Sequence, residues 1–154
     1  MAGIAETFKV TLEADGLRAA IRWLNDRVSC RFTAIFAFDG DMLRNICLID
    51  KEDPNIINCL DQPITDSYCI YIKRSRDYFS VEEAMLDKRV ELHPKRRSYQ
   101  CCYGISLFGA KGKLLGTVCH FDKAPVQLTE NVVAALDELA LFIAEAAFGM
   151  TEIN

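Results

Sequence analysis

The stretch "SYQCCYGISLFGAKGKLLGTVCHFD", from Ser98 to Asp122, contains two β-strand patterns separated by a glycine-flanked turn. The segments Tyr99 to Leu107 and Leu114 to Phe121 are rich in aromatic, β-branched and small apolar residues, as strands are. Gly109 to Gly112 supplies a turn between them. This stretch therefore predicts an antiparallel hairpin near the centre of the fold.

Cys119 and His120 are adjacent on the second strand of this hairpin. Successive side chains on a strand point to opposite faces, so the thiol and the imidazole face away from each other. A nucleophile and its base, or two ligands of one metal ion, need side chains that converge. We therefore predict that Cys119 and His120 form neither a catalytic pair nor a metal site, and that both faces of the strand are covered.

The turn also predicts how the two strands pair. With Gly109 to Gly112 as the turn, three pairs follow: Phe108 with Lys113, Gly104 with Thr117, and Cys102 with Cys119. One face of the hairpin then carries only small side chains, namely Cys102, Gly104, Ser106, Thr117 and Cys119. The other face carries larger side chains that suit helix packing, namely Tyr103, Ile105, Leu107 and Val118. A face of small side chains leaves room either for a closely packed helix or for a ligand, and the residues alone favour neither.

The N-terminal part of the chain predicts one helix and a second hairpin. Apolar residues recur at helical spacing between Leu12 and Val28, which is typical of an amphipathic helix. Asp39-Gly40 is a hairpin turn signal, and its flanks predict strands at Phe32 to Phe38 and Met42 to Ile49. Lys51 to Pro63 has no clear period and predicts a connecting loop.

The remaining segments predict short elements and a long last helix. Thr65 or Asp66 caps a helix that runs to about Arg74. A strand at Tyr78 to Val81, a short helix at Glu82 to Asp87 and a basic loop at Arg89 to Ser98 follow. The last helix, Asn131 to Phe148, is apolar almost all round and needs cover on both sides. These elements predict one α+β domain, residues 1–154, with a mostly antiparallel sheet and the terminal helices on one face.

Composition excludes several classes of protein. The chain has 154 residues, of which 51% are hydrophobic and 26% charged, which suits one ordered domain. A net charge of −4 argues against a nucleic-acid partner. No secretion signal and no membrane-spanning run is present, so we expect a cytoplasmic protein. The seven cysteines are odd in number and form no recurring CxxC pair, so we expect mostly buried thiols.

Four stretches resemble GAF domains, the small-molecule sensor modules related to PAS domains. They are "RFTAIFAFDGDMLRNICLID" (Arg31 to Asp50), "PITDSYCIYI" (Pro63 to Ile72), "VEEAMLDKRV" (Val81 to Val90) and the hairpin stretch quoted above. In that hairpin, Ser106-Leu107, a glycine turn and Leu115-Gly116-Thr117 follow the family pattern. The resemblance implies a pocket on the sheet face opposite the terminal helices, roofed by middle helices and loops, with the small-residue face as its floor.

A ligand site follows from this resemblance. The family's arrangement aims the free N–H groups of the Thr65-Asp66-Ser67 helix start at the pocket, and such an end favours an anion or a carboxylate. Arg97 could add a counter-charge, although a basic run such as "KRR" is more often a solvated turn. We therefore predict a polar or anionic small-molecule ligand, with no catalytic residue, no metal and no specified cofactor. The predicted ligand-binding residues are Asp66, Ser67, Tyr68, Cys69, Arg97, Cys102, Gly104, Thr117, Cys119 and Phe121.

One stand-alone enzyme, the free methionine-(R)-sulfoxide reductase, shares the resemblance. Its chemistry needs an attacking thiolate, a resolving cysteine and carboxylates that position the substrate. Cys59 and Cys69 match two non-catalytic cysteines of that enzyme family. The attacking cysteine would fall near Lys95, and the pocket acids would fall at Cys102, Cys119 and Phe121, so this chain lacks both. A divergent thiol reductase that uses Cys69 with Cys59 is therefore an alternative hypothesis.

Other cysteine and histidine chemistry is less favoured. Cys69, Cys102 and Cys119 could converge beneath the middle helix, as for a soft metal or a redox pair, but buried inert thiols are the simpler interpretation. A strained Cys102–Cys119 disulfide is conceivable, and we expect free thiols in reducing buffer. His93 and His120 lack a metal-binding motif, and we interpret them as a capped loop histidine and a buried or edge histidine. The Cys-His of bilin-binding GAF domains precedes a helix, whereas here the dipeptide lies in a strand.

Three functional hypotheses result. The first is a non-catalytic sensory GAF domain that acts through a signalling partner protein or through homodimerisation. The second is the divergent thiol reductase. The third is a structural module whose terminal helices pair through an apolar stripe from Val132 to Ala147, with a vestigial pocket.

Overall fold

A six-stranded antiparallel sheet forms the centre of the computed structural model, which describes residues 3–149 except the side chain of Val132. From edge to edge the strand order is β3-β2-β1-β6-β5-β4. The strands are β1 (Phe32–Asp39), β2 (Met42–Asp50), β3 (Gln62–Pro63), β4 (Tyr78–Val81), β5 (Cys101–Phe108) and β6 (Leu114–Asp122). Every pairing in this sheet is antiparallel, as predicted.

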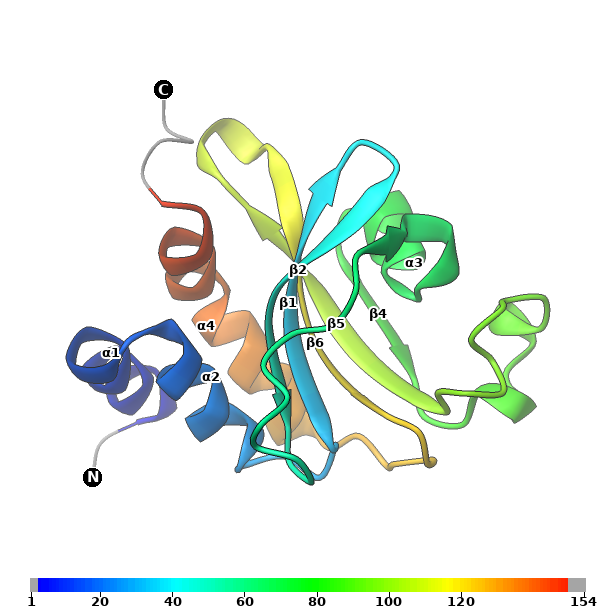
Figure 1. Ribbon diagram of the computed structural model, residues 1–154, viewed down its shortest axis with the longest axis horizontal. Coiled ribbons are helices and arrows are strands. Elements are labelled where there is room, and N and C mark those ends of the chain that lie inside the picture. Colours follow the sequence, from blue (N-terminus) through cyan, green and yellow to red (C-terminus); the bar gives the residue numbers. More distant parts are fainter. Residues whose placement is uncertain (1–2, 150–154) are drawn as a thin grey trace.

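Helices and loops cover the sheet from both sides (Figure 1). The helices α1 (Ile4–Asp15), α2 (Leu17–Asn25) and α4 (Glu130–Phe148) lie on one face. The short helix α3 (Cys69–Ser75) and the segment 82–100 lie towards the other face. This confirms the predicted α+β fold with terminal helices on one face. No helix within residues 3–149 is both long and apolar enough to cross a membrane.

The C-terminal helix α4 is covered on two sides, as its apolar sequence requires. Leu136, Leu139 and Ile143 are fully buried, and the helix contacts β5 on one side and α1 on the other. Ala140 and Ala147 pack against the same core. Most of the described apolar residues of α4 are thus packed within the chain, whereas Leu141 is 62% exposed, and dimerisation through the terminal helices stays a prediction. Val132, which belongs to the predicted dimer stripe, lies outside the described side chains.

The first helix predicted over Leu12 to Val28 is in fact two helices. Gly16 separates α1 from α2 with a φ of +93°, a conformation that favours glycine. The Gly16 N–H donates to the carbonyl of Leu12, and the Gly16 carbonyl accepts from the N–H of Ala20. The apolar period continues across this break, so periodicity alone predicted one continuous helix.

The hairpin of β5 and β6 is shifted by two residues from the predicted register. Gly104 lies opposite Cys119, and Cys102 lies opposite Phe121. The sequence predicted Thr117 and Cys119 at these two positions, so the prediction was wrong. Because side chains alternate with a period of two, a shift of two leaves every side chain on its predicted face.

The cause of the shift lies at the turn. Phe108 pairs with Leu114 instead of Lys113, and the ladder is irregular between Leu107 and Phe108. The residues Ala110–Gly112 form a 3-10 turn. The turn is therefore longer than the tight glycine turn that the sequence predicted.

The start of α3 also differs from the prediction. The helix begins at Cys69, and a 3-10 turn at Ile64–Asp66 precedes it. The side chain that hydrogen-bonds the start of the helix is that of Ser67, rather than Thr65 or Asp66. Ser67 Oγ accepts from the N–H of Cys69 at 3.1 Å. The two-residue strand β3 lies in the predicted loop and pairs with the start of β2.

Candidate ligand cavity

A cavity of about 350 Å³ lies between the sheet and the start of α3. Seven of the ten predicted ligand-binding residues line it, namely Asp66, Ser67, Tyr68, Cys69, Cys102, Cys119 and Phe121. Residues that were not predicted complete the lining. Phe32, Phe36 and Leu48 come from β1 and β2, Lys95 and Tyr99 from the loop before β5, and Cys59, Leu60, Asp61 and Gln62 from the segment that ends in β3.

The other three predicted residues do not line the cavity. Gly104 lies under α3, where a Cβ atom would come within 2.6 Å of Ile72 Cδ1. Thr117 Oγ1 lies 3.4 Å from Cys69 Sγ, also beneath α3. Arg97 is exposed and away from the cavity lining. The small-residue face thus serves both purposes that the sequence allowed. It lets α3 pack closely at Gly104 and Thr117, and it leaves space at Cys102 and Cys119.

Aromatic rings form one wall of the cavity. Phe32 and Phe121 lie on the paired strands β1 and β6, and their rings are stacked with centroids 4.9 Å apart. The Tyr99 ring meets both edge-on, at 6.2 Å and 5.5 Å. Tyr68 donates its hydroxyl to the Tyr99 carbonyl at 2.7 Å, which ties α3 to this wall. A wall of this kind suits the flat, apolar face of a ligand.

The polar groups of the lining lie mostly on the segment before α3. Asp61 accepts a hydrogen bond from the Asn45 N–H at 3.1 Å, so its position is fixed by β2. Asp66 and Lys95 add one carboxylate and one ammonium group. The side chains around the cavity therefore carry two negative charges and one positive charge. In the first turn of α3, the N–H of Cys69 donates to Ser67 Oγ and that of Ile70 to the Ser67 carbonyl, so neither is free for an anion.

Four of the lining residues are cysteines, and all seven cysteines of the chain are free thiols. The sulfur of Cys69 lies 3.4 Å from Thr117 Oγ1, and the Cys69 thiol also interacts with the side chains of Cys119 and Ser67. The interaction with Cys119 is the largest cause that lowers the pKa of Cys69 to about 7. The same network raises the pKa of Cys119, which hydrogen-bonds Cys102 and Cys69. Among residues 3–149, no cluster of His, Cys, Asp or Glu has the arrangement of a metal site.

The two histidines lie where the sequence placed them. His120 is fully buried on the helix-covered side of the sheet, whereas Cys119 belongs to the cavity side. His93 lies in the loop before β5, where its Nδ1 accepts from the N–H of Lys95 at 3.0 Å. Its ring packs on the ring of Tyr68 with centroids 4.7 Å apart. His93 therefore supports the cavity from behind and does not line it.

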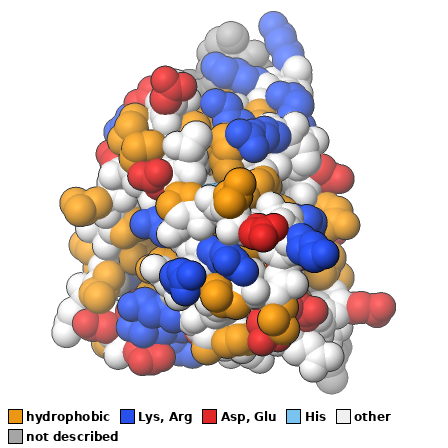
Figure 2. Space-filling model, turned by 90° about the vertical axis from the view of Figure 1, so that its right-hand side faces the viewer, with side chains coloured by type: hydrophobic (Ala, Val, Ile, Leu, Met, Phe, Trp, Pro, Cys, Tyr) orange, Lys and Arg blue, Asp and Glu red, His pale blue; other side chains and the backbone are white. Residues whose placement is uncertain are grey.

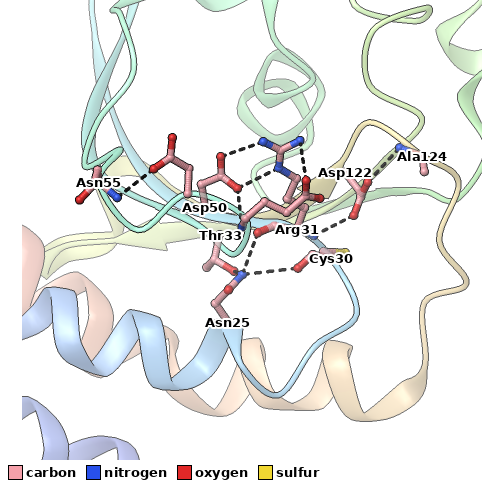
Figure 3. Close-up of polar contacts among 10 residues, drawn as sticks. Asn25, Cys30, Arg31, Thr33, Asp50, Asn55, Asp122 and Ala124 are labelled. Carbon is pink, nitrogen blue, oxygen red and sulfur yellow. Dashed lines mark hydrogen bonds and ion pairs between the residues drawn. The ribbon is translucent and has the colours of Figure 1, made fainter.

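A partly buried ion pair fixes the end of β1 that carries Phe32 (Figure 3). Arg31 donates from Nε and one terminal nitrogen to the two carboxylate oxygens of Asp50, at 2.8 Å and 3.0 Å. Its backbone N–H donates to Asp122 at 2.8 Å. Asp122 also accepts from the N–H of Ala124. These contacts join the ends of β1, β2 and β6 beside the aromatic wall, and the guanidinium lies 4.7 Å from the Phe32 ring centre.

The surface over α3 and the segment 82–100 is mixed in character (Figure 2). Basic side chains lie among exposed hydrophobic ones, of which Leu92 is 96% exposed and Leu86 is 76% exposed. A second hollow on the surface, of about 340 Å³, includes Arg74, Lys88 and Arg89. Arg89 already pairs with Asp87 at 2.6 Å, so part of this positive charge is neutralised within the chain.

Comparison with known proteins identifies the fold. No family model matches the chain, and no curated protein sequence matches it. The structure is similar to the GAF domain of the Acinetobacter phosphoenolpyruvate-protein phosphotransferase, with a TM-score of 0.74 and 12% identity over 96% of this chain and 94% of that one. It is also similar to the substrate complex of free methionine-R-sulfoxide reductase from Neisseria meningitidis, with a TM-score of 0.75 and 12% identity over 98% and 90% of the two chains.

A third similar structure is the phycocyanobilin-bound GAF domain of a cyanobacterial phytochrome, with a TM-score of 0.68 and 13% identity over 93% of each chain. The chain therefore has the GAF fold, as its sequence predicted. This fold is shared by ligand-binding sensory domains and by the sulfoxide reductases.

Proposed function

We propose that this chain is a sensory GAF domain that binds a small molecule in the cavity and is not itself an enzyme. The observation that carries the proposal is the combination of an aromatic wall with polar groups on the segment before α3, around a cavity of about 350 Å³. Small-molecule sites are typically concave, mainly apolar and furnished with a few polar groups. The site residues of the proposal are the seven predicted residues that line the cavity.

The charges of the lining favour a neutral or cationic polar group over the anion that the sequence suggested. Asp61 and Asp66 outnumber Lys95, and Arg97 lies away from the cavity. A planar ring that stacks on Phe32 and Phe121, with a polar edge directed at Ser67 and Gln62, fits these features. The response to this ligand passes to a signalling partner or to a second copy of the chain.

A thermal-shift screen tests ligand binding. The panel comprises purine nucleosides, cyclic nucleotides, amino acids and nitrate, each added to the native chain and to Cys59→Trp. Cys59 lines the cavity, so an indole there occupies the space of the ligand. Ile57→Trp is the matched control, because Ile57 is 57% exposed and away from the lining. A ligand of the cavity raises the Tm of the native chain and of Ile57→Trp but not of Cys59→Trp. Equal shifts in all three proteins would argue against this site.

A second candidate function, thiol-dependent reduction, is favoured by one observation. Cys59 and Cys69 line the same cavity, and the pKa of Cys69 is lowered to about 7. We therefore propose a direct assay with free methionine-R-sulfoxide and dithiothreitol as the reductant. Turnover that is lost in Cys69→Ser would support a reductase. If the native chain shows no turnover, this candidate is excluded.

A further inference from the structure

Three thiols from three different elements meet at the floor of the cavity. Cys69 begins α3, Cys102 lies on β5 and Cys119 lies on β6. All three line the cavity. Thr117 Oγ1 lies 3.4 Å from Cys69 Sγ, and Cys119 is two residues further along β6 on the same face of the sheet. Cys119 therefore lies between a thiol on the helix side and one on the strand side, and its own thiol interacts with both.

Cys69 is the thiol of this group that is best prepared to react. Its sulfur accepts hydrogen bonds from Cys119, Ser67 and Thr117, and the Thr117 hydroxyl lies 3.4 Å away. Hydrogen bonds that are donated to a sulfur stabilise its thiolate form, and the thiolate is the nucleophile. Although Cys69 is only 2% exposed, it borders the cavity, so a small molecule reaches it without unfolding of the chain.

We propose that Cys69 is a site of covalent oxidation by small hydroperoxides, and that Cys119 resolves the product into a Cys69–Cys119 disulfide. In the first step the Cys69 thiolate attacks one peroxide oxygen. An S–O bond forms, the O–O bond breaks, and the leaving oxygen takes a proton to give water or an alcohol. Sulfur loses two electrons and the peroxide gains them, which leaves Cys69 as a sulfenic acid.

In the second step Cys119 attacks the sulfur of the Cys69 sulfenic acid. An S–S bond forms, the S–O bond breaks, and the hydroxide that leaves takes the proton of the Cys119 thiol to become water. Cys119 is the resolving thiol because it lies on β6 on the same face as Thr117, whose hydroxyl is 3.4 Å from the Cys69 sulfur, and because the two thiols interact. Cys102 lies on the neighbouring strand β5 and interacts with Cys119 rather than with Cys69.

A second pair of thiols shows why access matters. The thiols of Cys30 and Cys101 also interact with each other, on the side of the sheet that the terminal helices cover. They are 1% and 0% exposed, and neither lines the cavity. We therefore expect hydroperoxides to oxidise the pair at the cavity and to leave the pair beneath the helices unchanged.

The disulfide would join α3 to β6 across the cavity floor. Formation of an S–S bond requires the two sulfur atoms to approach to about 2 Å, which draws the start of α3 towards the sheet. This inference deepens the proposed function, because the oxidant enters the cavity proposed for the ligand. Its test needs no ligand. A screen that finds no ligand would not contradict the disulfide, and the absence of the disulfide would not contradict ligand binding.

The test is a count of free thiols followed by a peptide map. Reduced native chain is freed of reductant, exposed to hydrogen peroxide, unfolded and alkylated with N-ethylmaleimide. The seven free thiols should fall to five. After digestion with trypsin, peptide 52–73, which contains Cys69, should be linked by a disulfide to peptide 114–123, which contains Cys119.

Single variants identify the two sulfur atoms. Cys59→Ser is needed because Cys59 shares peptide 52–73 with Cys69, and the bridge should persist in this variant and in Cys102→Ser. Cys69→Ser and Cys119→Ser should lose it, and in Cys119→Ser dimedone should label Cys69 as the trapped sulfenic acid. The inference is overturned if the native chain keeps seven thiols, if Cys30 and Cys101 form the bridge, or if a bridge survives in Cys69→Ser. The thiol count and the peptide map of the native chain decide the first two outcomes, so a poorly folded variant cannot obscure them.

Discussion

Thr33 Oγ1 and His120 Nδ1 lie 2.7 Å apart in the interior between the sheet and the terminal helices. Asn25 donates to the same Thr33 hydroxyl at 2.9 Å. The tautomer of the imidazole decides which of Thr33 and His120 donates this bond, and burial keeps the imidazole neutral because it lowers the pKa of His120 to about 3. This polar chain links α2, β1 and β6, and it explains why a histidine is fully buried on a helix-packed face.

The buried His120 should make the protein less stable in mild acid. Burial lowers the pKa of His120 from 6.5 to about 3. Between these values the unfolded chain binds a proton that the folded chain does not, so the free energy of unfolding falls as the pH falls below about 6.5. The slope is at most about 1.4 kcal/mol per pH unit, or about 2 kcal/mol by about pH 5. Urea unfolding at several pH values from about 7 to about 5 measures it.

Two variants separate the two histidines in this measurement. His120→Gln keeps an acceptor for Thr33 but cannot titrate, so its stability should depend less on pH than that of the native chain. Burial also lowers the pKa of His93, so His93→Gln is examined in parallel. If His120→Gln retains the full native slope, the buried imidazole is not its source.

The Arg31–Asp50 ion pair should contribute more to stability than exposed pairs do. The Asp50 side chain is 1% exposed, and its hydrogen bond with Arg31 is the main cause of its lowered pKa. Asp50→Asn leaves the guanidinium with only the exposed Glu52 carboxylate, at 3.6 Å, so we expect a clearly lower urea midpoint. Asp39→Asn is the matched control, because the Asp39–Arg44 pair is exposed on both sides and spans 3.5 Å. Equal effects of the two variants would contradict this interpretation.

The fold was predictable from sequence because it depends on alternation and turn signals. The faces of β5 and β6 were correct even though the register was shifted, since face assignment depends only on whether the shift is even or odd. The register itself depends on the length of the 3-10 turn at Ala110–Gly112, and the glycines in the sequence do not indicate how long this turn is. The break at Gly16 was missed because apolar residues recur at helical spacing on both sides of it.

The cavity was predictable only in part. Its floor followed from the small residues of β5 and β6, but of its aromatic wall only Phe121 was predicted. The alternation of β1 places Phe32, Ala34 and Phe36 on one face, and this signal could have identified Phe32 and Phe36 as lining residues. Asp61 and Gln62 had no such signal, because the segment 51–61 lacks any period and its position depends on long-range contacts such as the bond from the Asn45 N–H to Asp61.

Gly104 should be required for the close packing of α3. A Cβ atom there would lie 2.6 Å from Ile72 Cδ1 and 2.9 Å from Cys119 Cβ. Gly104→Ala should therefore cost about 1–3 kcal/mol of unfolding free energy, as overpacking does. Ile72→Val removes the Cδ1 atom, so the double variant should be more stable than the sum of the two single changes predicts. Urea unfolding of the four proteins completes the cycle. Strict additivity would show that the two side chains do not compete for the same space.

The reactivity of Cys69 should report the hydrogen bonds around its sulfur. Its pKa is lowered to about 7, so its alkylation by iodoacetamide should reach half its maximal rate near that pH, whereas an ordinary thiol does so at about 8.5. Peptide 52–73 gives the rate for Cys69 alone in a Cys59→Ser background. Ser67→Ala and Thr117→Val each remove one donor and should raise the midpoint by roughly one pH unit, the worth of one hydrogen bond to a charged group. Cys102→Ser is the control and should leave the midpoint unchanged, because no hydrogen bond from Cys102 reaches Cys69. A midpoint near 8.5 in the native chain would mean that burial, which raises the pKa of Cys69, outweighs its donors.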